Sequence, residues 1–93
     1  MTSNEVLAMY ENIAALTGRM ATAASEGDLD KVARLETQCA LQAAPARGGV
    51  PALEGEQRQR KIALLKQIMA NDRAVRDVTE PWMGQIDRAL AAH

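Results

Sequence analysis

The sequence predicts an all-α protein, a small antiparallel helical bundle in which a helical hairpin is followed by a long third helix and a short C-terminal fourth helix. Apolar residues recur at steps of three and four along most of the chain, which places them on one face of each helix. Capping residues, glycine and proline stand between these patterned segments. With 93 residues, the chain has room for a single domain, residues 1–93.

The first helix is expected over residues 3–26. Thr2 and Glu5 have the spacing of a capping box, in which each side chain bonds the backbone amide of the other residue. The apolar stripe that follows consists of Val6, Met9, Tyr10, Ile13, Leu16, Met20 and Ala24. Gly27 ends the helix, because glycine adopts the left-handed conformation at a helix C-terminus without steric strain.

The second helix is expected over residues 29–44, with Asp28 as its N-cap. Its apolar stripe consists of Leu29, Val32, Leu35, Cys39 and Ala43. So short a connection predicts that the first two helices lie antiparallel. Glu36 falls inside the stripe and should come level with Arg19, which predicts an ion pair between the helices. Alternatively, Glu36 lines a groove where polar groups fix the register of an incoming helix.

Residues 45–55 are expected to form a flexible connector, because two prolines and three glycines interrupt the pattern there. The third helix is expected over residues 56–79. Its apolar residues form two strips roughly 100° apart around the helix, and the second strip needs a cover from the last helix or from a partner. Asp72 interrupts the apolar run, where a buried carboxylate without a donor would be unfavourable. Alternatively, Asp72 lines the same partly covered groove as Glu36. The strips are Ile62, Leu65 and Met69, and Leu64, Ile68, Val75 and Val78.

A separate short helix is expected over residues 81–92. Pro81 lacks an amide hydrogen and its ring clashes with the preceding turn, which favours a break or a sharp kink at this point. The apolar face of this segment consists of Trp82, Met83, Ile86 and Leu90. A helix this short is marginal in water, so it should be ordered only when it docks on the rest of the chain. The segment is therefore a detachable cover, or else a plain closing helix.

The composition disfavours several classes of function. The formal net charge is −1 with both signs interspersed, which gives no field for nucleic acid or for a membrane surface. No apolar run of about 18 residues is present for membrane insertion, and no secretory signal is visible. We therefore expect a cytoplasmic protein.

No catalytic residue, metal ligand or cofactor site is predicted. The single histidine, His93, is the last residue, where nothing fixes its geometry. The single cysteine, Cys39, lies in an apolar stripe and has no histidine partner, so we interpret it as a small buried hydrophobe. The basic run "RQRK" at 58–61 has no aromatic neighbours and is typical of a solvated helix face.

Three segments carry a resemblance to a known family. "MYENIAALTGRM", "EGDLDKVARLE" and "IMANDRAVRDVTEPWMGQID" resemble the FliT family of flagellar export chaperones, in its beta-proteobacterial form, from about residue 6 to residue 90. The resemblance implies a non-enzymatic, cytoplasmic chaperone that binds the C-terminal helical part of the filament-cap protein FliD, prevents its premature self-assembly and helps deliver it for type III export. It also implies contacts with the export ATPase complex and the export gate, and in some bacteria with the transcriptional regulator FlhDC.

Carried onto this sequence, the resemblance implies a partner-binding groove and a regulatory C-terminal helix. The groove would be lined by Leu29, Val32, Glu36, Cys39, Ile68, Asp72 and Val75. The regulatory helix would contain Pro81, Trp82, Met83, Ile86 and Leu90, and would cover the groove until a partner arrives.

Three other functions remain open at this stage. One is a coiled-coil oligomer or homodimer, because exposed apolar strips on small helical proteins often close by self-association. Another is an adaptor that acts only as an anti-activator of flagellar transcription. The third is a small helical enzyme with the chorismate mutase fold, which needs converging cations that Arg19, Lys31, Arg34 and Lys66 do not clearly supply.

Overall fold

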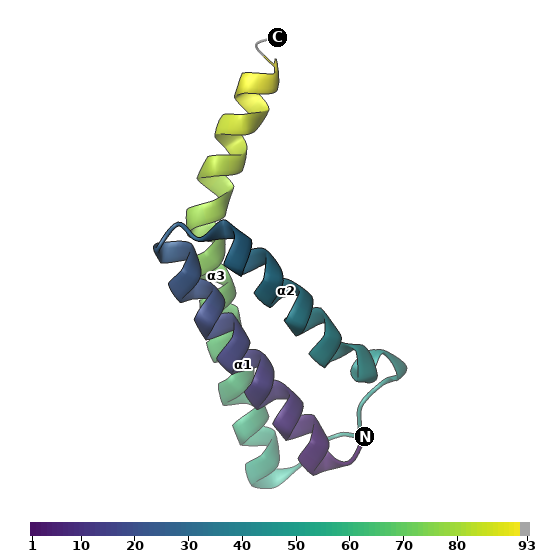
Figure 1. Ribbon diagram of the computed structural model, residues 1–93. Coiled ribbons are helices and arrows are strands. Elements are labelled where there is room, and N and C mark those ends of the chain that lie inside the picture. The colour runs from purple at the N-terminus through teal and green to yellow at the C-terminus, as the bar shows by residue number, and fades with distance from the viewer. Residues whose placement is uncertain (92–93) are drawn as a thin grey trace.

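The computed structural model describes the backbone of residues 1–91 and the side chains of residues 1–81, 88 and 91. The described chain contains helix α1 (Ser3–Ser25), helix α2 (Leu29–Ala43), a short 3₁₀ helix η1 (Ala44–Gly48) and helix α3 (Gly55–Ala91). Figure 1 shows an up-down-up arrangement, in which α2 runs against α1 and α3 runs in the same direction as α1. The predicted all-α class is confirmed.

Local capping residues define both ends of α1, as predicted. The Thr2 amide donates to the Glu5 carboxylate at 3.1 Å, and the Glu5 amide donates to the Thr2 hydroxyl at 3.2 Å. At the other end Gly27 has a φ of +77°. There the Asp28 amide donates to the Ala23 carbonyl at 2.9 Å and the Gly27 amide to the Ala24 carbonyl at 3.0 Å, the two bonds of a Schellman motif.

The N-cap of α2 is also as predicted, because the Asp28 carboxylate accepts a bond from the Lys31 amide at 3.1 Å. The connector differs from the prediction in its first half. Residues 44–48 form η1 instead of irregular loop, with Pro45 in its first turn. Proline is tolerated there because the first amides of a helix have no intrahelical acceptor.

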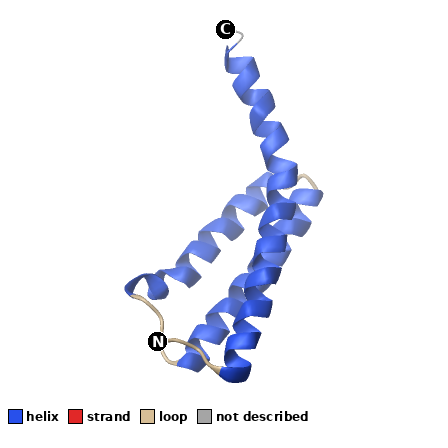
Figure 2. Cartoon of the chain, turned by 180° about the vertical axis from the view of Figure 1, so that it is seen from behind, coloured by secondary structure: helices blue, strands red, loops and turns tan. Residues whose placement is uncertain are grey.

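Helix α1 is the central element of the fold. It packs against both α2 and α3, whereas α2 and α3 hardly contact each other. The three helices meet in a core cluster near the Gly27 turn, formed by Met20, Ala23, Ala24, Val32, Leu35 and Val75. Figure 2 shows α2 diverging from the other two helices as it leaves this turn. Away from the turn, α1 and the residues beside it bury Val6, Met9, Leu53 and Leu64.

The predicted break at Pro81 is wrong. Helix α3 runs without interruption from Gly55 to Ala91 and contains Pro81, so the chain has no separate fourth helix over residues 81–92 in its described part. Pro81 removes one intrahelical bond, to the Asp77 carbonyl, and crowds the preceding turn. Pro81 and Asp77 are both exposed, and the helix continues on either side of the missing bond.

The continuous α3 extends well beyond the bundle. Contacts between α1 and α3 join residues 53 and 54 positions apart, so the end of α1 at Ser25 lies level with about residue 79 of α3. Figure 1 shows the rest of α3 projecting past the Gly27 turn. The longest dimension of the molecule, 54 Å, equals the length of α3 itself, about 55 Å at 1.5 Å per residue. We call residues 80–91 the C-terminal arm.

Candidate functional site

A polar contact fixes α3 against α1 next to the core cluster. The Asn71 side-chain amide donates to the Thr17 hydroxyl at 3.2 Å and to the Ala14 carbonyl at 3.4 Å. The Thr17 hydroxyl in turn donates to the Ile13 carbonyl at 2.9 Å. Since Thr17 is only 8% exposed, these bonds are shielded from water and define the register between the two helices.

Replacement of Asn71 by alanine is expected to lower the free energy of unfolding by about 1 kcal/mol, the usual net value of one such hydrogen bond. The loss stays small because Thr17 retains its acceptor on Ile13. Chemical denaturation of Asn71→Ala and of Asn12→Ala measures it. Asn12 also bonds across helices, to Gln42 at 3.4 Å, but in an exposed position, so the control should lose less. Equal losses would contradict a special role for Asn71.

The residues of the predicted groove lie in three different environments. Val32 and Val75 are buried in the core cluster, and Cys39 packs against it. Leu29 and Ile68 are half-buried, whereas Glu36 and Asp72 are exposed. Three of the seven residues are thus brought together, but as parts of the core where α1, α2 and α3 meet. The others stand at the edges of that core, on α2 and α3.

Cys39 packs against the core cluster but is half-buried, where the sequence predicted a buried small hydrophobe. Its sulfur lies 3.8 Å from the sulfur of Met20. Burial, and secondarily the negative charge of Glu36, raise the pKa of the Cys39 thiol, so it stays protonated and unreactive near neutral pH.

The predicted ion pair between Arg19 and Glu36 does not form. Both residues are exposed, and the ion pairs among the described side chains join Arg60 to Glu11 at 3.6 Å and Arg76 to Asp72 at 3.0 Å. The reason is the position of Glu36 around the axis of α2. Leu35, not Glu36, occupies the buried position on α2, and the next residue in a helix lies about 100° further round.

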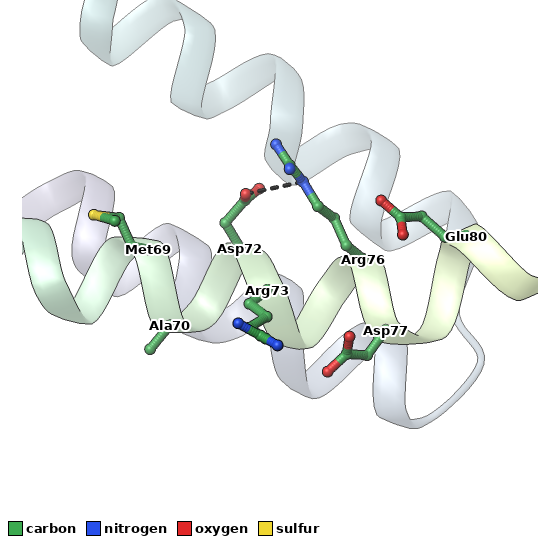
Figure 3. A pocket seen from close by; sticks show the side chains of 7 residues that line it. All are labelled: Met69, Ala70, Asp72, Arg73, Arg76, Asp77 and Glu80. Carbon is green, nitrogen blue, oxygen red and sulfur yellow. Dashed lines mark ion pairs between the residues drawn. The ribbon is translucent and has the colours of Figure 1, made fainter.

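The same one-residue shift places Asp72 outside the buried run of α3, so its carboxylate is not buried. Asn71 takes the position against α1, while Asp72 is exposed and pairs with Arg76 one turn away. Figure 3 shows Asp72 and Arg76 side by side on one flank of α3. Sequence reasoning did not select Asn71 as a site residue, although a short polar side chain within an apolar run is a signal for such a contact.

Two open hollows lie on the described surface. The larger, about 570 Å³, is formed on α3 alone (Figure 3) by Met69, Ala70, Asp72, Arg73, Arg76, Asp77 and Glu80. The smaller, about 380 Å³, lies between α1 and α2 and is lined by Asn12, Ala15, Leu16, Gln38, Leu41 and Gln42. Both combine apolar and polar side chains, and both are open to solvent. Hollows of this kind accept side chains of another helix more readily than they enclose a small molecule.

The C-terminal arm does not cover these surfaces. Its backbone continues the line of α3 away from the bundle (Figure 1), and Pro81 is exposed. The side chains of Trp82, Met83, Ile86 and Leu90 lie outside the described residues. A separate helix docked over the groove is therefore not the arrangement found here.

The described residues offer no obvious centre for metal chemistry. Among them, no group of three or more His, Cys, Asp or Glu side chains is placed to hold a metal ion. No described helix is long and apolar enough to cross a membrane.

An elongated helical fold with open, helix-lined hollows defines a small helical module suited to contact with other helices. The family model described as flagellar protein FliT matches residues 7–92, and the chain belongs to this family of flagellar chaperones. No curated protein and no solved structure matched the chain.

Proposed function

We propose that the chain is a cytoplasmic export chaperone that binds the C-terminal helical part of the filament-cap protein FliD. In this role it keeps FliD from assembling prematurely and presents it to the export ATPase complex and the export gate. Membership of the FliT family supports this proposal. A further interaction with the regulator FlhDC, as an anti-activator of flagellar transcription, is part of the same proposal. None of these roles makes the chain an enzyme.

The observation that carries the proposal is the incomplete packing between α2 and α3. Helices α2 and α3 hardly contact each other, although each has one face on α1. Half-buried Leu29 and Cys39 on α2 and half-buried Ile68 on α3 border the core without being fully covered. A client helix laid between α2 and α3 would complete the burial of these side chains, as amphipathic helices do in apolar grooves.

Apolar residues also recur in the sequence of α3 beyond the level where α1 ends. Leu64 and Val75 are buried on the α1 side of α3, and positions 82 and 86 follow Val75 by seven and eleven residues in the same continuous helix. That spacing keeps a residue on one helical face. Beyond Ser25, α1 no longer runs beside this face. We therefore include Trp82 and Ile86, with Met83 and Leu90, in the proposed regulatory segment.

Sedimentation of the full chain with a C-terminal FliD fragment tests the proposal. A one-to-one complex is expected, because the proposed site between α2 and α3 occurs once in each chain. The alternative is a coiled-coil oligomer or homodimer, which two exposed apolar side chains favour, Leu41 at 69% and Met69 at 68% exposure. A self-associated chain whose sedimentation is unchanged by the FliD fragment would support that alternative and contradict the chaperone.

Glu36→Ala probes the groove within the same experiment. Glu36 is exposed and has no ion pair among the described side chains, so its loss should leave the melting temperature nearly unchanged. If it meets a polar group of the client, its loss should weaken the complex severalfold. Arg34→Ala is a matched control on α2, also exposed. Equal binding by both variants would remove Glu36 from the site.

A further inference from the structure

The outer side of α3 carries an amphipathic cationic stripe that the proposed groove does not use. It consists of Arg58, Ile62, Lys66, Met69, Arg73 and Arg76. These positions follow one another by four, four, three, four and three residues, so they form a single line along the helix. All six are exposed. We call this line the α3 stripe.

The stripe lies on the side of α3 turned away from α1. The α1-facing side is defined by Leu64 and Val75, which are buried, and by Asn71, which bonds to Thr17. Met69 and Arg73 each lie two residues from Asn71, about 200° around the helix. The apolar members, Ile62 at 41% and Met69 at 68% exposure, are therefore not covered by the described bundle.

The basic run at 58–61 divides between two faces. Arg60 pairs with Glu11 at 3.6 Å, and the Lys61 ammonium lies 5.9 Å from the centre of the Tyr10 ring. Arg58 belongs to the stripe, where it, Lys66 and Arg73 form no ion pair with any described side chain. Arg76 shares its charge with Asp72 at 3.0 Å. Arg60 and Lys61 therefore contact side chains of α1, whereas Arg58, Lys66 and Arg73 face solvent.

The stripe has a defined length and a hollow at one end. Asp77 and Glu80 close the cationic stretch, which spans residues 58 to 76 or about 27 Å of helix. Met69, Arg73 and Arg76 line the 570 Å³ hollow on α3, together with these two acids, Ala70 and Asp72, which is paired with Arg76 (Figure 3). A partner side chain can therefore enter the surface beside Met69 instead of resting on a convex helix.

We propose that the α3 stripe docks an acidic amphipathic helix of another protein. Two apolar residues seven positions apart, with cations around them, match a helix that carries apolar residues at the same interval and carboxylates on either side. A phosphate backbone would leave Ile62 and Met69 without apolar partners. A membrane-surface helix inserts a broad apolar face, whereas the broad apolar face of α3 is already packed on α1.

A synthetic helical peptide with leucines seven residues apart and flanking glutamates tests the proposal on the full chain. We expect saturable binding that weakens as salt rises, because the contacts between exposed charges are screened. The same peptide with glutamine in place of glutamate should bind at least tenfold more weakly. Equal affinity for the two peptides would show that charge is not recognised and would overturn the proposal.

Two triple variants with the same net charge locate the site. Arg58→Glu, Lys66→Glu and Arg73→Glu together should weaken peptide binding about 30-fold, since each reversal replaces an attraction by a repulsion. The control, Arg19→Glu, Arg34→Glu and Arg47→Glu, reverses exposed cations outside the stripe and should change affinity less than threefold. If both triple variants weaken peptide binding equally, the effect depends on net charge alone, and the proposal is overturned. Circular dichroism verifies that both variants remain helical.

The apolar part of the stripe has its own test. Met69→Ala should weaken peptide binding three- to fivefold, whereas Leu41→Ala, equally exposed on α2, should not weaken it. Binding of the full chain to vesicles of phosphatidylcholine and phosphatidylserine, without binding of the peptide, would assign the stripe to membranes and overturn the proposal.

Discussion

Replacement of Leu35 by alanine is expected to lower the free energy of unfolding by about 2–5 kcal/mol, the range for truncation of a buried leucine. Leu35 is 2% exposed and lies in the core cluster that joins all three helices. Four of the five other buried residues in that cluster are alanines or valines, Ala23, Ala24, Val32 and Val75. Such short side chains reach poorly into a cavity, so we expect an effect in the upper part of the range.

Leu41 supplies a matched control for this substitution. It lies on the same helix but is 69% exposed, so Leu41→Ala should change the free energy of unfolding by no more than about 0.5 kcal/mol. Urea denaturation followed by circular dichroism compares the two variants. Because small domains have only about 5–15 kcal/mol of total stability, Leu35→Ala should unfold at a much lower urea concentration than Leu41→Ala. If both variants unfold at a similar urea concentration, the core cluster does not hold the bundle together.

The helical hairpin was predictable because its determinants are local. Each capping contact joins residues within about one helical turn, namely those of Thr2, Glu5, Gly27 and Asp28. Both partners of each contact therefore lie close together in the sequence. The functional class cannot be read from apolar periodicity and came from the family resemblance. The match over residues 7–92 confirms it.

The site was less predictable, because it depends on rotation about helix axes. Apolar spacing defines a stripe but leaves its edges uncertain by one residue, and one residue is about 100°. Thus Leu35 and Asn71 pack against the bundle, whereas the predicted site residues Glu36 and Asp72 are exposed. The residues of α1 that accept the hydrogen bonds of Asn71 lie more than fifty positions away in the sequence. No local sequence pattern can predict a contact between residues so far apart.

Pro81 was mispredicted because two energies of similar size compete there. An interior proline disfavours a helix by about 3 kcal/mol, whereas breaking α3 would leave several further backbone groups without partners. In the continuous helix Pro81 is exposed, and the balance favours continuity. A balance this close also makes residue 81 the point in α3 where the C-terminal arm can bend with the smallest loss.

Removal of the C-terminal arm by truncation after Thr79 is expected to strengthen binding of the FliD fragment about tenfold. We propose that the arm alternates between the extended form found here and a form folded back at Pro81, in which its apolar residues compete for the groove. If folding back is worth a net 1.4 kcal/mol or so, its loss raises the apparent affinity by a factor of about ten. Calorimetric titration of the truncated and full chains measures the difference.

Pro81→Ala separates the loss of competition from the loss of contacts. Alanine restores the amide that bonds the Asp77 carbonyl and removes the ring, which stiffens α3 in its extended form. The variant keeps Trp82 and Ile86, and should nevertheless bind the FliD fragment more tightly than the natural chain, as the truncated chain does. The opposite result is equally clear. If truncation abolishes binding while α1, α2 and the remainder of α3 stay folded, the arm is part of the client surface and its regulatory role is excluded.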